Sequence, residues 1–301
     1  LEDLKGDASR RRRERIIRGA FFISAALAIV ISVGIVLSLL GDTIVFLQGI
    51  DAGALLADVW QPRSGQYGLA TIISGTLVIS IIAMIVATPL GLGAAIYLAE
   101  YASPRVRGWL KPILEILATI PSVVLGFFAL TVISPTIVQN ICPGTTPVFS
   151  LASAGVAVGI LITPLIASIS EDAMYAVPNN LREASYGLGA NKRTTSIRVV
   201  VPAAVSGIVA SLIVGFSRAV GETMIVAIAA GGVGGAVFSI NPCLPGQTMT
   251  GAMTVIAIGS DAVGGGVAFN SLFFVGLLLF FMTLGLNLIS EAFVRRLRKG
   301  Y

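Results

Sequence analysis

The sequence predicts an all-α, polytopic membrane protein with six transmembrane helices. Hydrophobic residues make up 55% of the chain and charged residues only 12%, and the mean hydropathy is +0.93. Several apolar segments reach roughly 20 residues, the length that crosses about 30 Å of hydrocarbon. Since lipid offers no hydrogen-bonding partner to the backbone, each of these segments is expected to be an α-helix.

Six apolar segments are candidate spans. They are residues 16–40, 70–99, 112–139, 151–170, 202–230 and 269–292. The second contains Pro89 followed by Gly91 and Gly93, which predicts a kink or a helix break. The third carries Pro121 at mid-depth and is expected to bend. The basic segment at the start leads directly into a full-length span, so no cleavable signal peptide is expected.

The lysines and arginines predict the orientation. Eighteen of the twenty lie before the first span or after the second, fourth and sixth. The exceptions are Arg63 and Arg218. The positive-inside rule then places both termini in the cytoplasm of a multi-pass inner-membrane protein. We expect a basic cytoplasmic segment, 1–18, followed by one transmembrane domain, 19–301. The run Arg10–Arg13 is typical of an anchor beside anionic lipid, which is favoured over a nucleic-acid patch.

Segments on the opposite side of the membrane have a different composition. The apolar stretch 248–258 is too short to span, which predicts a re-entrant or surface helix. Cys142 and Cys243 both fall on this oxidising side. The two cysteines either form a disulfide or remain two free, buried thiols, and the sequence is compatible with both. The chain has no histidine, and the two cysteines lack ligand spacing, so no metal site is expected.

Arg218 and Glu222 interrupt the fifth apolar segment. Each costs roughly 2.5–3.5 kcal/mol near a bilayer centre on insertion scales. Four residues apart on a continuous helix, they would lie one turn apart on the same face. A cation and a carboxylate facing a bundle interior indicate a pathway for a charged solute. The alternative is an ion pair that only locks helix packing.

The loop at 181–202 is polar and basic, and it lies on the cytoplasmic side of the predicted topology. Gly187 and Gly189 permit a sharp turn between two short helices. Pro202 joins the loop directly to the span that carries Arg218. These features predict a compact helical protrusion on which a partner docks.

At these residues the chain resembles the membrane subunits of type I ABC importers. Their cytoplasmic signature is E-A-A, three residues, G, nine residues, then I-x-L-P. Here it stands as Glu183, Ala184, Ser185, Gly189, Val199, Val201 and Pro202, with conservative departures at the third alanine and at both aliphatic positions. The resemblance implies coupling helices that sit in a cleft on a separate ATPase subunit. The chain has no G-x-x-x-x-G-K-[ST] motif, so ATP and Mg²⁺ are expected on that partner and no cofactor on this chain.

Three further blocks narrow the resemblance to the phosphate-specific (Pst) importer permeases. They are TPLGLGAAIYLAEY at 88–101, PILEILATIPSVVLGFFAL at 112–130 and SRAVGETM at 217–224. The resemblance covers about residues 16–298, and the continuation GETMIVAIAAGG is similar to the PstC type rather than the PstA type. It implies a non-catalytic permease subunit of an ATP-driven phosphate importer. The implied partners are a PstA-type sister permease, two copies of an ATP-binding subunit and an extracytoplasmic phosphate-binding protein.

The side-chain chemistry of Arg218 is compatible with phosphate as the transported solute. A guanidinium offers a fork of donors matched to phosphate oxygens. Glu222 accepts the proton that phosphate retains near neutral pH and that sulfate lacks, so it is expected to supply discrimination. Ser217 and Thr223 are candidate hydroxyl donors to the path, although such side chains often bond back to their own helix. Ser122 follows a proline that frees backbone groups to line the pore.

Other functions stay open. Another oxyanion such as molybdate or sulfate, or the PstA-type sister role, fits the same framework. A secondary anion transporter or channel would use Arg218 without an ATPase. A non-transporting scaffold would keep the Arg218–Glu222 pair for structure alone.

Overall fold

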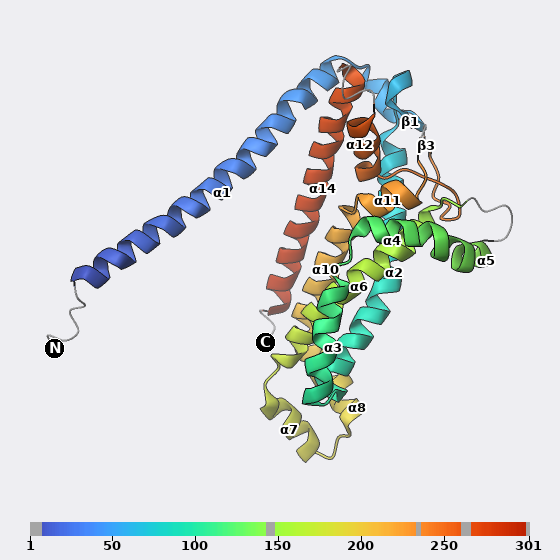
Figure 1. The fold of residues 1–301 in the computed structure, drawn as a ribbon. Coiled ribbons are helices and arrows are strands. Elements are labelled where there is room, and N and C mark those ends of the chain that lie inside the picture. Colours follow the sequence, from blue (N-terminus) through green and yellow to red (C-terminus); the bar gives the residue numbers. More distant parts are fainter. Residues whose placement is uncertain (1–7, 143–147, 233–235, 260–265, 299–301) are drawn as a thin grey trace.

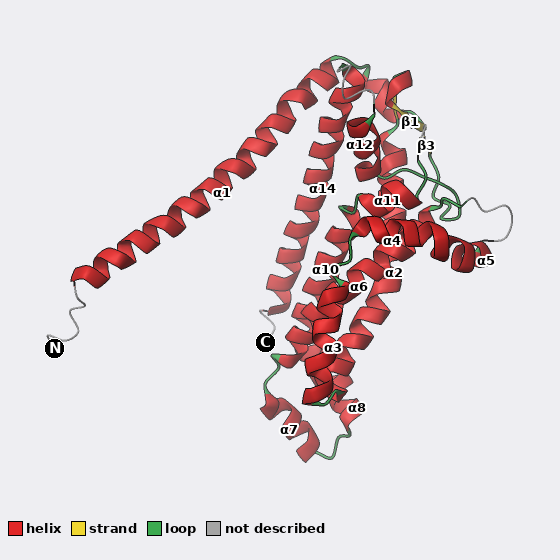
Figure 2. Ribbon diagram, in the orientation of Figure 1, coloured by secondary structure: helices red, strands yellow, loops and turns green. Residues whose placement is uncertain are grey.

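The computed structural model is a long helical bundle with a small β-sheet at one end (Figure 1), and helix dominates the chain (Figure 2). It describes residues 8–142, 148–232, 236–259 and 266–298. The longer helices are α1 (Ala8–Gln48), α2 (Leu69–Ile96), α3 (Pro104–Leu117), α6 (Leu151–Tyr175), α10 (Val205–Val220), α12 (Met249–Ile258) and α14 (Val267–Arg298). The shorter ones are α4 (Ser122–Phe128), α5 (Gln139–Ile141), α7 (Asn179–Gly187), α8 (Lys192–Thr195), α9 (Val201–Ala203) and α11 (Met224–Ala229).

The remaining elements are π-helical, 3₁₀ and β segments. The π-helical segments are η4 (Tyr97–Tyr101), η5 (Ala129–Val138) and η6 (Ser196–Val200). The 3₁₀ turns are η2 (Ala52–Leu56) and η3 (Pro62–Ser64). The strands are β1 (Val59–Gln61), β2 (Gln66–Tyr67) and β3 (Ala236–Val237).

Five helical segments of the described chain are long and apolar enough to cross a membrane. They are Arg12–Gln48, Leu69–Tyr101, Ser122–Ile141, Leu151–Tyr175 and Val267–Ile289. A sixth is obtained if Lys192–Ala203 and Val205–Val220, which meet at a bend of 70°, count as one span. The predicted all-α membrane fold is therefore confirmed, with the fifth predicted span bent and broken.

Close packing of α2 on α6 forms the centre of the bundle, and glycine makes it possible. A Cβ at Gly155 would lie 2.8 Å from the side chain of Ile82, and one at Gly159 would lie 2.8 Å from that of Val86. On the α2 side, a Cβ at Gly91 would lie 2.8 Å from Ile166. Small residues at such positions let helix backbones approach closely, so α2 and α6 behave as one packed unit.

The two prolines singled out from the sequence act differently. At Pro121 the predicted third span is divided into α3 and α4, and Pro121 itself is extended at φ −57° and ψ 129°. Proline disfavours the helical conformation of the residue before it, which explains the division. By contrast, α2 runs unbroken through Pro89 and ends in the π-helical segment η4, so of the predicted kink or break the structure excludes a break.

The sheet end of the bundle carries the three-stranded antiparallel sheet, in the order β2-β1-β3. Trp60 and Tyr67 face each other across β1 and β2 and pack with Phe46 into a buried cluster. α12 covers the 248–258 segment and packs between α11 and α14, with Met249 and Ile256 buried. The segment is therefore a short helix packed among other helices, and its placement as a re-entrant or a surface helix stays a prediction.

α1 stands away from the rest of the bundle and joins it only near the sheet end (Figure 1). Most of its apolar side chains, such as Phe21, Phe22 and Ile29, are exposed within the chain. α1 ends and α14 begins at the sheet end. The start of α1 and the end of α14 therefore both lie away from the sheet, toward the end that carries α7 and α8 (Figure 1). Residues 1–7 of the predicted basic segment and 299–301 of the predicted domain lie outside the described residues.

Candidate functional site

A helix break separates Arg218 from Glu222. α10 ends at Val220, Gly221 forms its C-cap, and α11 begins only at Met224. The single continuous helix expected from hydropathy is therefore wrong at this point. Glu222 stabilises the start of α11 after the break. Its Oε1 accepts hydrogen bonds from the backbone N–H groups of Met224 at 3.2 Å and Ile225 at 3.4 Å. A carboxylate that satisfies the free donors of a helix start stabilises a new helix there.

Arg218 and Glu222 consequently have different environments. Arg218 lies in the last turn of α10 and is exposed. Its side chain makes no hydrogen bond or ion pair with any described residue. Glu222 is only 9% exposed, and no bond joins its carboxylate to Arg218. The contact that a purely structural Arg218–Glu222 pair requires is thus missing from the described chain.

Hydroxyl groups surround the break, and one of them holds its backbone. Thr250 of α12 donates its hydroxyl to the carbonyl oxygen of Glu222 at 2.7 Å, and Thr248 caps α12 beside it. Ser217 donates to the Oδ1 atom of Asn287 on α14 at 3.3 Å. Thr223 bonds back to Gly221 at 3.3 Å. Thr250 and Asn287 were missed from the sequence, although each is a polar residue inside an apolar helix.

Ser122 is the first residue of α4, directly after Pro121, and it is half-buried. α4 packs on α11, where a Cβ at Gly126 would lie 3.0 Å from Ile228. The structure therefore places Ser122 and Thr223 at the starts of two neighbouring helices. No hydrogen bond links them.

The 181–202 loop forms the helical protrusion that its sequence predicts. α7 and α8 flank Gly189, whose φ of +83° requires the left-handed conformation that glycine adopts without strain. Asn191 caps α8 by accepting the Thr194 N–H at 2.8 Å. The hydroxyls of Ser185 and Thr195 meet at 2.9 Å and hold the two helices together.

The face of this protrusion that points away from the bundle is exposed and partly apolar. Glu183 and Ala184 are exposed, and Leu188 at the tip is 89% exposed. Pro202 lies in α9, directly before the 70° bend into α10. Pro202 therefore connects the protrusion to α10, the helix whose last turn carries Arg218.

A cluster of charged residues, missed from the sequence, joins α3 to α6 near this end. Glu171 is 0% exposed and forms ion pairs with Arg107 and with Lys111, the latter at 2.8 Å. Lys111 also bonds Asp172 at 2.5 Å. Burial disfavours the charge of Lys111, but its hydrogen bonds to Asp172 and Glu171 and their charges outweigh burial and raise its pKa above 10.5.

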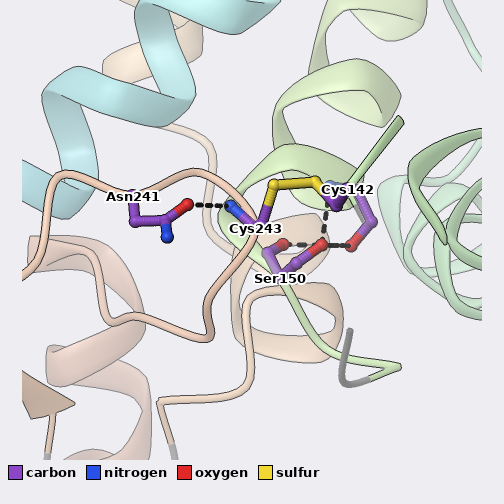
Figure 3. The surroundings of a disulfide bond; sticks show 5 residues. Cys142, Ser150, Asn241 and Cys243 are labelled. Atoms are coloured by element: carbon purple, nitrogen blue, oxygen red, sulfur yellow. Dashed lines mark hydrogen bonds between the residues drawn. A yellow bond between two sulfur atoms is a disulfide. The ribbon is translucent and has the colours of Figure 1, made fainter. Parts of the chain in front are cut away.

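At the sheet end, a disulfide joins Cys142 to Cys243 across 101 residues, with their Cα atoms 5.8 Å apart (Figure 3). Backbone hydrogen bonds also hold the turn around Cys243 to the start of α6: Leu151 N–H donates to Leu244 O, and Ala152 N–H to Pro242 O. The end of α5 is thereby attached to the segment that leads into α12. Among the described residues, no three His, Cys, Asp or Glu side chains gather as a metal site would require.

The fold is thus a membrane bundle with a broken helix, an exposed arginine near the break and a helical protrusion at one end. Residues 87–300 match the family described as "Binding-protein-dependent transport system inner membrane component". The chain belongs to this family of transport permeases.

Individual relatives are named for particular transport systems. The chain is 32% identical to the probable ABC transporter permease protein YqgH of Bacillus subtilis, over 89% of this chain and 87% of that protein. It is 31% identical to the phosphate transport system permease protein PstC of Haemophilus influenzae, over 95% and 94%. It is 32% identical to PstC of Pasteurella multocida, over 80% and 78%.

Solved structures support the fold. A bacterial alginate ABC transporter, in complex with a pentasaccharide-bound periplasmic protein, superposes with a TM-score of 0.64 at 15% identity, covering 94% of this chain and 96% of that one. The inward-facing MetNI methionine ABC transporter gives 0.57 at 18% identity, covering 74% and 93%. At these identities the likeness concerns the fold alone.

Proposed function

We propose that this chain is the PstC-type permease subunit of an ATP-driven importer of inorganic phosphate. The observation that carries the proposal is the similarity, over most of the chain, to relatives named phosphate transport system permease protein PstC. The partners are a PstA-type sister permease, two ATP-binding subunits that hold ATP and Mg²⁺, and an extracytoplasmic phosphate-binding protein. This chain itself is non-catalytic.

The membrane orientation follows from charge. With the 181–202 loop and both termini in the cytoplasm of a bacterial inner membrane, the basic segments lie on the side that favours them. The sheet end, with the Cys142–Cys243 disulfide, then faces the oxidising side. That is the side from which a binding protein delivers solute.

Transport proceeds by alternating access in this proposal. ATP closes the two ATPase subunits, the 181–202 loop receives that movement, and helix groups rock about the site. Glu183, Ala184, Ser185, Gly189 and Pro202 form the coupling surface and its turn.

Arg218 supplies positive charge to phosphate, and its freedom from other bonds within the described chain supports this role. Glu222 supplies discrimination: Oε1 is occupied by backbone donors, whereas Oε2 has no hydrogen-bond partner among the described residues and is free to accept a phosphate proton. Ser217, Thr223 and Ser122 line the same path.

The test is ATP-driven phosphate uptake in proteoliposomes that contain the whole complex, with ATP hydrolysis followed in the same vesicles. Arg218→Gln should abolish uptake while hydrolysis persists. Arg105→Gln is the control, because Arg105 is also an exposed arginine whose side chain makes no hydrogen bond or ion pair with a described residue. Uptake that survives Arg218→Gln would remove Arg218 from the path.

The same vesicles separate the alternatives. Competition by sulfate and molybdate distinguishes a different oxyanion permease. Uptake without an ATPase subunit, or with the 181–202 loop deleted, would identify a secondary transporter instead.

A further inference from the structure

α7, the first helix of the 181–202 loop, has little packing against the bundle. None of its residues is buried. A cavity of about 490 Å³ lies beside it, lined by residues of α7, of η4 and of the chain just after α6, including Tyr186, Glu100 and Val177. Apolar packing therefore does not explain how α7 is fixed to the transmembrane helices.

One side chain provides the attachment. Arg182 donates from Nε and Nη2 to Oε1 of Glu100, at 3.1 and 2.8 Å. Its Nη2 also donates to Met174 O at 2.9 Å, and its Nη1 donates to Val177 O at 2.5 Å and to Asn179 Oδ1 at 3.3 Å. The side chains of Arg182 and Glu100 are only 14% and 3% exposed. An ion pair so shielded and so fully hydrogen-bonded holds a defined geometry.

The groups that Arg182 contacts belong to the packed centre of the bundle. Glu100 lies in η4, the π-helical continuation of α2, and Met174 lies in the last turn of α6. Met174 O also accepts the backbone N–H of Val177 at 3.2 Å, and a cation beside the last carbonyls of a helix is favoured. Since α2 and α6 pack as one unit through their glycines, the guanidinium attaches α7 to both at once.

The next residue faces the other way. Glu183, within the docking motif, is exposed, whereas Arg182 is mostly buried against the bundle. A short polar route through Arg182 therefore connects the exposed face of α7 to α2 and α6.

We infer that Arg182 is a positioning residue that transmits movement of the 181–202 loop to α2 and α6, with Glu100 as its receptor. The inference rests on the proposed function, because it needs an ATPase subunit docked on the loop. Without the Arg182–Glu100 bond, α7 moves into the neighbouring cavity independently of α2 and α6. The ATPase then hydrolyses ATP without moving these two helices. Docking itself does not depend on Arg182, since its side chain points into the bundle.

The experiment compares phosphate uptake per ATP hydrolysed in proteoliposomes of the whole complex. For Arg182→Gln we expect the ATPase subunits to remain bound, hydrolysis to stay close to the native rate, and uptake per ATP to fall about tenfold. Glu100→Gln should shift the same ratio in the same direction. Arg182→Lys, which keeps the charge but loses the fork, should be intermediate. Arg105→Gln should leave the ratio unchanged.

The outcomes separate this inference from the function on which it rests. An unchanged uptake-to-hydrolysis ratio in both Arg182→Gln and Glu100→Gln would overturn the inference while the native complex still supports ATP-driven transport. Loss of the ATPase subunits from Arg182→Gln would also overturn it, because Arg182 would then serve docking. If the Arg182→Gln permease itself does not fold in the membrane, Glu100→Gln decides alone. A native complex that takes up phosphate without any ATPase would instead refute the proposed function.

Discussion

The hydroxyl of Thr250 on α12 donates a 2.7 Å hydrogen bond to the backbone carbonyl of Glu222, in the break between α10 and α11. Both residues are largely buried, at 5% and 9% exposure. The carbonyl at a helix break has lost its partner within the helix, and here α12 replaces that partner. The short buried helix from the sheet end thus fixes the segment that carries the proposed discrimination site.

Thr250→Val tests this support. Valine keeps the shape but leaves the Glu222 carbonyl without its donor, which costs about 1–3 kcal/mol for a buried group. We expect a lower melting temperature of the purified complex and a reduced rate of phosphate uptake. Thr254→Val is the control, because the Thr254 hydroxyl only bonds back to Thr250 O within α12. Equal effects of the two variants would contradict a specific role for the Thr250 bond.

Glu222→Gln tests the charge at the break while preserving its shape. The amide oxygen of glutamine still accepts from Met224 N–H and Ile225 N–H, so the start of α11 should be retained. The side chain, however, can no longer take a proton from phosphate. We expect the preference for phosphate over sulfate to fall by about tenfold, or 1.4 kcal/mol. The measurement is sulfate competition against labelled phosphate uptake; an unchanged preference would end the discrimination hypothesis.

Hydropathy predicted which segments are helical but not where they break. The break at Gly221 was missed because apolar residues continue on both sides, although a glycine followed by an acidic residue is the pattern that ends one helix and starts another. Pro121 was recognised as a bend for a related reason, since a proline is a local feature of the chain. By contrast, Arg182 and Glu100 are 82 residues apart, and nothing in their spacing reveals that they meet. Glycine spacing and turn chemistry predicted the 181–202 loop well, because its form is local.

The Cys142–Cys243 disulfide predicts a labelling pattern. These are the two cysteines of the chain, so the denatured protein should take up no thiol reagent without reductant and two equivalents after reduction. Removal of the bond frees a long loop, for which about 2–4 kcal/mol of stability is typically lost. Cys142→Ser, Cys243→Ser and the double variant should therefore melt at one common, lower temperature, because each removes the same bond. Two labelled thiols before reduction would contradict the disulfide.

The attachment of α3 to α6 predicts a specific pH dependence. Lys111 bonds Glu171 and Asp172, and its pKa is raised above the ordinary 10.5 because these acidic partners outweigh the effect of burial. A lysine whose folded-state pKa is raised stabilises the fold fully below the unfolded-state pKa and loses that contribution as pH rises through the folded-state value. Lys111→Met should accordingly lower the stability of the complex by about 1–3 kcal/mol. Because the pKa of Lys111 is raised, this stability difference between the native chain and the variant should stay the same between pH 6 and pH 9.

Above about pH 10.5 the native chain should lose this advantage and approach the variant, as the ammonium group is deprotonated in both folded and unfolded states. Melting temperatures of the native complex and of Lys111→Met across this range provide the measurement. Lys111→Arg is the control, because an arginine keeps its charge throughout and should retain the native stability at high pH. A difference that disappears already between pH 6 and pH 9 would contradict the raised pKa. In that case the ion pair of Arg107 with Glu171, which remains when Lys111 is replaced, would be what joins α3 to α6.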